Sequence, residues 1–248
     1  TGYFCSFLQY GKINQKTHKR EPLAVRSVRS YKSILYAVFN QAVIDELVKM
    51  NPVLTISVHG KKNADYSEEL LFLTEEEISD LIHFLSRRYP RLVGIAFMGS
   101  YYGLRRSEIL GLKWSAVDFK KKTISINHTV VRVKTVTTSD STKTYSSKRT
   151  LNLFDTAEKC LLQIKQEQEE NKAFFKRDYK NKEGYIFTWE NGEAYDPNYI
   201  TRTFNHATRE FGRPEITLHK LRHSCASMLI NKGWDIKKLQ YWLGHSDT

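Results

Sequence analysis

Cysteine is scarce in this sequence. The 248 residues include only Cys5, Cys160 and Cys225, which are far apart, odd in number and without metal-ligand residues nearby. This spacing argues against a disulfide framework and gives no sign of a structural zinc site. We expect the three thiols to be small buried side chains.

Long hydrophobic runs are missing as well. No stretch approaches the roughly 18 apolar residues that a membrane span requires, and the first residues, Thr-Gly-Tyr-Phe-Cys, lack the basic and then apolar order of a signal peptide. The sequence also lacks a carboxylate cluster that would hold two metal ions and a glycine-rich loop that would cradle phosphates. We therefore expect a cytoplasmic protein that contacts no membrane and uses no metal or other cofactor.

Positive charge is the feature that the chain has in excess. It holds 39 Lys and Arg against 27 Asp and Glu, a formal net charge of +12. Such a surface attracts polyanions, so nucleic acid is the first candidate partner, with an ordinary basic protein as the alternative. The cations cluster near the start of the chain, where we expect them to contact DNA phosphates. These candidate DNA-binding residues are Lys12, Lys16, Lys19, Arg20, Arg26, Arg29 and Lys32.

The spacing of apolar residues predicts two domains. Residues 22–50 have a helical period that indicates about two amphipathic helices, and Asn51-Pro52 ends it. The following segment shows no sustained period and is interpreted as a linker over 55–73, in which Lys61 and Lys62 could follow a DNA backbone. We thus expect a partial helical domain over 1–54 and a second domain over 74–248.

The second domain is predicted to be mainly α with a small antiparallel sheet. Thr74 and Glu77 form a capping box at the first helix, and Gly103 ends another helix that begins near Arg91. Alternating β-branched residues predict a strand pair, joined by a loop rich in Ser and Thr. The strands are expected over 122–133 and 148–153. Further helices are expected over 155–171, where Asp155 and Glu158 form a second capping pattern, from 196, over 218–232 and over 235–243.

Three short motifs carry the chemistry. They are Gly103-Leu104-Arg105-Arg106-Ser107-Glu108, His219-Lys220-Leu221-Arg222-His223 and Leu243-Gly244-His245-Ser246. Each is too short to be specific alone, but their order and spacing, with Lys143-Thr144 between the first two, form a combined signal. Together they resemble the tyrosine recombinase family, to which phage and conjugative-transposon integrases belong. The resemblance covers most of the chain after Thr74, and the first part resembles the helical core-binding domain of that family more weakly.

The residue types fit phosphodiester chemistry independently of the family. Two guanidiniums, Arg105 and Arg222, can neutralise the charge that builds up on the non-bridging oxygens of an attacked phosphate. His219 lies three residues before Arg222, so a helix would place both on one face. His219 could accept the proton of a nucleophile, and His245 could donate a hydrogen bond to the phosphate.

The resemblance implies further roles. A lysine of the hairpin protonates the leaving 5′ oxygen, and Lys143 in Lys-Thr-x-x-Ser-x-Arg-Thr matches it, although Lys134 and Lys148 flank that position. The family's nucleophile is a tyrosine that would follow Thr248, so we expect the chain to be a fragment. Tyr241 precedes His245 and is expected to be structural.

These inferences predict a site-specific recombinase that cleaves and rejoins double-stranded DNA through a 3′-phosphotyrosyl link, and integrates and excises a mobile element. By resemblance, it would act as a dimer on one site and a tetramer in synapsis, with an accessory DNA-bending or excision factor, at the bacterial nucleoid. Two alternatives are a type IB topoisomerase, which shares this residue set, and a catalytically inert DNA-binding protein of the same fold. Arg106, Glu108 and His223 are interpreted as supporting residues.

Overall fold

The computed structural model describes residues 11–13, 18–58, 72–132, 136–139 and 148–244. The chain divides into two compact units, Thr1–Leu70 and Leu71–Thr248, and each is described by itself. In the described part of the chain, no helix is both long and apolar enough to cross a lipid bilayer.

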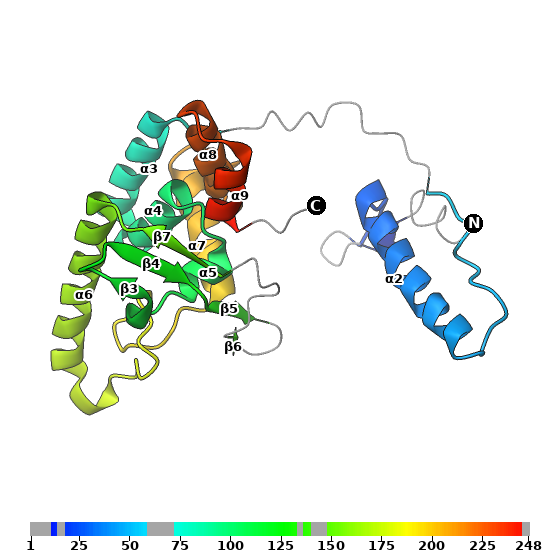
Figure 1. Ribbon diagram of the computed structural model, residues 1–248, viewed down its shortest axis with the longest axis horizontal. Helices are drawn as coiled ribbons and strands as arrows, with labels where there is room; N and C mark the ends of the chain where they lie inside the picture. The colour runs from blue at the N-terminus through cyan, green and yellow to red at the C-terminus, as the bar shows by residue number, and fades with distance from the viewer. Residues whose placement is uncertain (1–10, 14–17, 59–71, 133–135, 140–147, 245–248) are drawn as a thin grey trace. The chain divides into compact units, whose positions relative to one another are not determined.

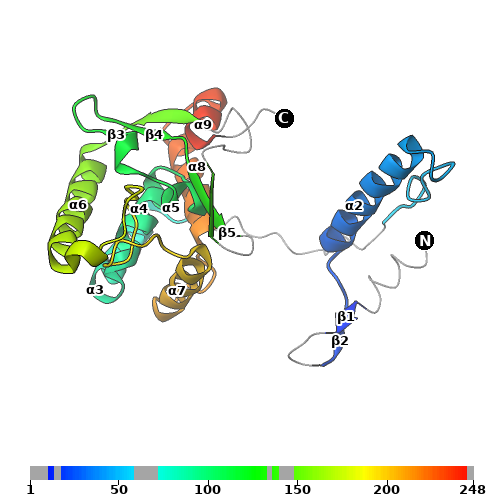
Figure 2. The same cartoon turned by 90° about the horizontal axis from the view of Figure 1, so that it is seen from below.

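The N-terminal unit is built on one long helix, α2 (Val25–Ile44; Figure 1). The helix follows a short antiparallel pair, β1 (Lys12–Ile13) and β2 (Arg20–Glu21), which is labelled in Figure 2. The sequence predicted about two helices as far as residue 50. The chain leaves the helix at Asp45 instead, and Glu46 takes a left-handed conformation with φ of 59° that a helix cannot continue through.

The segment after α2 folds back on it. The buried Asn51 side chain donates hydrogen bonds to the carbonyl oxygen of Tyr36 and to Asn40 Oδ1, and it accepts one from the Val53 amide. Val53 and Val28 form the small core of this unit.

The predicted linker over 55–73 lies largely outside the described residues, which resume at Phe72. At its first end, Ile56 and Val58 pack against the core of the N-terminal unit. At its other end, Leu73 belongs to the core of the C-terminal unit, where its amide donates to Ser224 Oγ.

The C-terminal unit is mainly helical, as predicted, and α4 lies at its centre, in contact with α3, α5, α6 and α8 (Figures 1 and 2). One continuous apolar core joins these helices to the sheet. The helices are α3 (Glu75–Arg88), α4 (Val93–Tyr101), α5 (Arg106–Leu110), α6 (Asp155–Phe175), α7 (Pro197–Glu210), α8 (Leu218–Asn231) and α9 (Ile236–Leu243).

The β structure is antiparallel but more divided than the single predicted hairpin. β3 (Val117–Asp118), β4 (Thr123–Ile126) and β7 (Arg149–Asn152) form one sheet in that order. β5 (Thr129–Arg132) pairs separately with β6 (Val136–Ser139). β6 lies inside the segment that was predicted to be a loop rich in Ser and Thr. The β-branched residues of Val136-Thr-Thr explain this strand.

Most predicted helix ends are found where their capping residues stand. Thr74 and Glu77 form the reciprocal capping box of α3, and the Asp196 carboxylate accepts from two amides at the start of α7. Among these helix starts, the exception is α6, whose N-cap is Phe154 and has no side-chain cap hydrogen bond. The acidic residues predicted to cap α6, Asp155 and Glu158, instead form ion pairs with Lys122.

Candidate active site

The first motif turns sharply between α4 and α5. Gly103 adopts a left-handed conformation with φ of 62°, and a Cβ there would lie 2.4 Å from Leu243 Cδ2. The turn places Arg105 just before α5, and Glu108 lies inside that helix. Glycine is therefore required by both the backbone angle and the close approach of α9.

Glu108 is the centre of the charged network. Its side chain is 2% exposed, and its Oε1 and Oε2 accept from Arg105 Nη1 and from the Arg105 amide, both at 2.8 Å. Arg149 Nη1 and Nη2 donate to the same two oxygens at 3.2 and 3.1 Å, and Arg222 Nη1 lies 3.8 Å from Oε2. One buried carboxylate thus joins three arginines from α5, β7 and α8.

Burial alone would raise the pKa of Glu108, but the hydrogen bonds and charge of Arg149, followed by those of Arg105, outweigh it and lower the pKa. Burial lowers the pKa of Arg222 to about 10, with Arg105 adding to the effect. Arg222 remains charged at neutral pH at that value. The network therefore holds an excess of positive charge.

The same arginines hold the end of α9. The carbonyl oxygens of Trp242, Leu243 and Gly244 accept respectively from Arg149 Nε at 2.7 Å, Arg222 Nη2 at 2.7 Å and Arg105 Nη2 at 2.9 Å. Carbonyls at a helix C-terminus lack partners within the helix and carry its partial negative charge, so cations stabilise them. The end of α9, up to Gly244, is consequently held by the arginines of this network.

A hollow of about 370 Å³ opens beside this network. Arg105, His219 and Arg222 line it together, and residues of α8 and α9 complete it. Arg222 is held by the Gly103 carbonyl at 2.6 Å, while the Arg105 side chain is 39% exposed and so accessible to a ligand. Three of the five predicted catalytic residues therefore converge on one site.

His219 is exposed in the first turn of α8. Although the residue is exposed, partial desolvation of its ring is the first cause that lowers its pKa, followed by the charges of His223, Arg222 and Arg105. The neutral imidazole is thereby favoured, which is the form that accepts a proton.

Two other predicted catalytic residues, Lys143 and His245, lie outside the described residues. Among the predicted DNA-binding residues, Lys16, Lys61 and Lys62 also lie outside them, and of Lys12 only the backbone, in β1, is described. Lys19, Arg20, Arg26 and Arg29 are exposed in the N-terminal unit, and Lys32 is partly exposed.

Sequence reasoning underestimated two residues and missed a third. His223 was assigned to packing, but it is exposed, lines the hollow and meets His219 edge to face with ring centroids 4.5 Å apart. Glu108 was treated as a supporting residue, yet it joins all three arginines. Arg149 was quoted only as part of the Lys143 motif. A cation at an inward position of a strand, alternating with buried Leu151, is the signal that could have revealed it.

Arg106 and Tyr241 have structural contacts. Arg106 donates to Thr201 Oγ1 at 2.6 Å, away from the hollow. The Tyr241 hydroxyl donates to the Thr150 carbonyl at 3.2 Å and accepts from the Thr150 amide at 3.3 Å, so it pairs with the backbone of β7.

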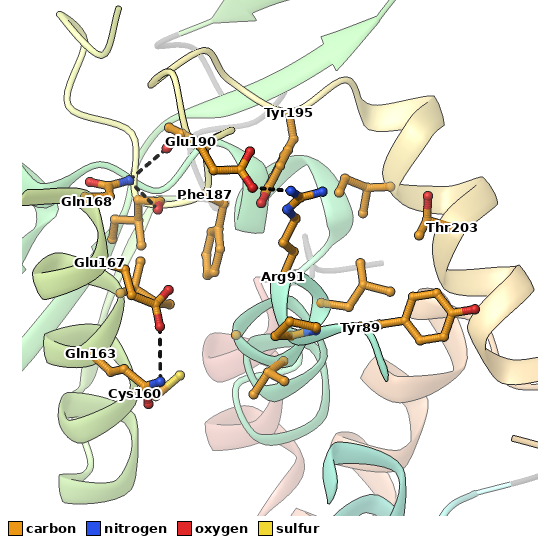
Figure 3. Close-up of a pocket in the computed structure, with 18 of the residues that line it drawn as sticks. Tyr89, Arg91, Cys160, Gln163, Glu167, Gln168, Phe187, Glu190, Tyr195 and Thr203 are labelled. Atoms are coloured by element: carbon orange, nitrogen blue, oxygen red, sulfur yellow. Dashed lines mark hydrogen bonds and ion pairs between the residues drawn. The ribbon is translucent and has the colours of Figure 1, made fainter. Parts of the chain in front are cut away.

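A larger hollow of about 630 Å³ lies between α6, α7 and the turn before α4 (Figure 3). None of the predicted site residues that the structure describes lines it. Its central charged side chains, Arg91 and Glu190, form an ion pair, and Glu167 accepts a hydrogen bond from Gln163. It brings together no set of residues with evident chemistry.

The fold and this site define a class of protein. The structure of the Tn1549 transposon integrase in complex with transposon right end DNA superposes with a TM-score of 0.73 at 22% identity, over 91% of this chain and 73% of that one. A lambda integrase dimer bound to a COC′ core site gives a TM-score of 0.59 at 17% identity, over 90% and 73%. The C-terminal unit thus has the fold of integrase catalytic domains.

The chain belongs to the phage integrase family, whose sequence profile matches residues 71–248. A tyrosine recombinase XerC-like protein of Caldanaerobacter subterraneus subsp. tengcongensis is 27% identical over 235 residues, which are 90% of this chain and 60% of that protein. The integrase of Staphylococcus phage L54a is 30% identical over 153 residues, 58% of this chain and 42% of that integrase. The chain therefore spans about half the length of these relatives.

Proposed function

We propose that this chain is the DNA-binding and catalytic part of a site-specific recombinase that integrates and excises a mobile element. The observation that carries the proposal is the convergence of Arg105, Arg222 and His219 on one hollow. A phosphodiester in the hollow would meet two charged guanidiniums. Glu108 orients Arg105, and backbone carbonyls orient Arg222, so neither needs to rearrange during the reaction.

The proposed step exchanges one phosphate ester for another. A tyrosine hydroxyl, which the family resemblance puts after Thr248, attacks the phosphorus in line and gives its proton to His219. The bond to the 5′ oxygen breaks, and that oxygen takes a proton from Lys143, while His245 donates a hydrogen bond to the phosphate. A 3′-phosphotyrosyl link and a free 5′ hydroxyl result, so the bond energy is kept for the reverse reaction.

The N-terminal unit, over 1–54 with a linker to 73, is proposed to supply a second DNA contact. Arg26, Arg29 and Lys32 follow each other at intervals of three on α2, which puts them along one side of the helix. With Lys12, Lys16, Lys19, Arg20, Lys61 and Lys62, they would neutralise phosphates and supply affinity that depends on salt.

The assembly is proposed from the relatives. One lambda integrase structure is described as a tetramer bound to a Holliday junction and another as a dimer bound to a core site. We propose the same stages for this protein on double-stranded DNA, in the bacterial cytoplasm at the nucleoid, with an accessory DNA-bending or excision factor.

The test uses the full-length natural protein and nicked duplexes that span the junctions of the element that encodes it. Cleavage releases a short strand and traps the covalent intermediate. We expect a protein–DNA adduct that survives denaturation, forms in the presence of EDTA, and is lost in Arg105→Ala, Lys143→Ala and Arg222→Ala. Lys148→Ala is the matched control for the hairpin lysine, and it should keep cleavage.

Two results would redirect the proposal. Absence of any adduct with intact DNA binding would favour an inert DNA-binding protein. Relaxation of a supercoiled plasmid without recombination between two sites would favour a type IB topoisomerase, which shares the residue set.

A further inference from the structure

Arg149 is a fully buried charged residue of this site. It begins β7, its side chain is 0% exposed, and it is not among the residues that line the hollow. A buried guanidinium is costly to desolvate, and it is tolerated only where its partners are well placed. What Arg149 contacts therefore indicates what it does.

Its guanidinium joins three segments that are distant in sequence. Nη1 and Nη2 hold the two oxygens of Glu108 in α5, and Nε holds the Trp242 carbonyl at the end of α9. Arg149 itself belongs to β7, whose partner strand β4 sets its register by pairing Ile126 with Arg149. One planar group thus fixes β7, α5 and the end of α9 relative to one another.

The close packing around Arg149 makes this arrangement specific. Gly244 is left-handed with φ of 65°, and a Cβ at this position would lie 2.6 Å from Arg149 Nη1. A lysine could neutralise Glu108, but a single ammonium cannot bond both carboxylate oxygens and a carbonyl in one plane. Charge alone would not reproduce the contacts.

We propose that Arg149 is a positioning residue for the phosphate site. It holds Glu108 in the orientation that aligns Arg105, and it holds the end of α9 beside Arg105 and Arg222. Arg149 acts through these groups and does not touch DNA. This inference rests on the proposed function.

Two variants of the full-length protein separate positioning from charge balance. Arg149→Met removes two of the hydrogen bonds that Glu108 accepts, so we expect the protein to be less stable. We also expect the single-turnover cleavage rate to fall about 100-fold, because a displacement of about 1 Å at a reacting group causes a loss of that size. The double variant Glu108→Gln, Arg149→Met removes both charges. It should unfold near the wild-type temperature yet still cleave about 100-fold more slowly, with DNA affinity retained.

Arg213→Lys is the matched control, because Arg213 also bridges two carboxylates, Glu77 and Glu215, but lies outside the hollow. It should keep the wild-type cleavage rate. Recovery of both stability and cleavage in the double variant would show that Arg149 only neutralises Glu108, and would overturn the proposal. Unchanged cleavage in Arg149→Met would overturn it as well.

A binding measurement keeps this inference distinct from the proposed function. Inorganic phosphate is titrated into the 248-residue chain, and the NMR signal of His219 Cε1–H reports occupancy of the hollow, with exposed His206 as the internal control. We expect Arg149→Met and the double variant to weaken phosphate binding at least about 5-fold, as a misaligned clamp requires. Equal affinity in all three proteins would contradict positioning, even if the wild-type protein never cleaves DNA.

Discussion

At the residue scale, the surroundings of His219 favour one of its protonation forms. Partial desolvation lowers the His219 pKa below its ordinary value of about 6.5, and His223 is the next cause, ahead of Arg222 and Arg105. Two imidazoles at 4.5 Å, beside two guanidiniums, cannot both be protonated without mutual repulsion. The pair therefore favours a neutral His219 at physiological pH.

The variant His223→Gln tests this interaction. It removes one repulsive partner, so the pKa of His219 should rise, as followed by the pH titration of its Cε1 proton in NMR spectra. Because the pKa of His219 is lower in the folded state than in the unfolded state, the unfolded chain binds more protons at this residue. The neutral His219 therefore contributes to the free energy of unfolding above about pH 6.5. That contribution is lost as pH falls through the folded-state pKa. An unchanged or lower titration midpoint in the variant would contradict the assignment.

At the element scale, the turn at Gly103 joins α4 to the arginine network. Its carbonyl orients Arg222, and its missing Cβ lets Leu243 of α9 approach. We expect Gly103→Ala to lower the free energy of unfolding by about 3 kcal/mol, because left-handed strain of about 1–2 kcal/mol adds to overpacking. Denaturant titration of the 248-residue chain measures the loss.

Gly212 provides the matched control for that experiment. It is also left-handed, with φ of 82°, but a Cβ there would meet nothing within 4 Å. Gly212→Ala should therefore show the strain alone, about 1–2 kcal/mol. Equal losses at the two glycines would show that the contact between Gly103 and α9 contributes nothing.

The elements also show what sequence could and could not predict. Several helix ends were predicted from a local signal, such as Thr74 with Glu77, Asp196 and Gly103. Such signals depend on neighbours within a few residues. The error at Asp155 has the opposite cause, since the ion pair with Lys122 comes from a segment that only the folded sheet brings near.

The candidate site divides in the same way. Arg105, His219 and Arg222 were predicted because each lies in a short motif with its own chemistry. Arg149 could not be predicted from the sequence, because its role exists only once β7, α5 and α9 meet. The contact of His223 with His219 could have been predicted, because residues four apart on one helix share a face.

At the scale of the whole molecule, a net charge of +12 could attract DNA in two ways, as a diffuse field or through placed contacts. The cluster in the N-terminal unit favours placed contacts. Changing Arg20, Arg26, Arg29 and Lys32 to glutamine should weaken DNA binding and flatten the dependence of log K on log salt, by about 0.9 for each phosphate contact that is lost.

Four exposed lysines of the C-terminal unit, from the turn before β4 and the end of α6, make the control: Lys120, Lys121, Lys172 and Lys176. Their change to glutamine lowers the net charge by the same amount, so a diffuse field would respond equally to both sets. If the contacts are placed, log K should fall more steeply with log salt in the control variant than in the N-terminal variant. Fluorescence anisotropy of a labelled duplex over a range of salt concentrations measures both slopes. Identical slopes for the two variants would mean that the N-terminal cations contribute charge but no contacts, and the N-terminal unit would lose its proposed role in DNA binding.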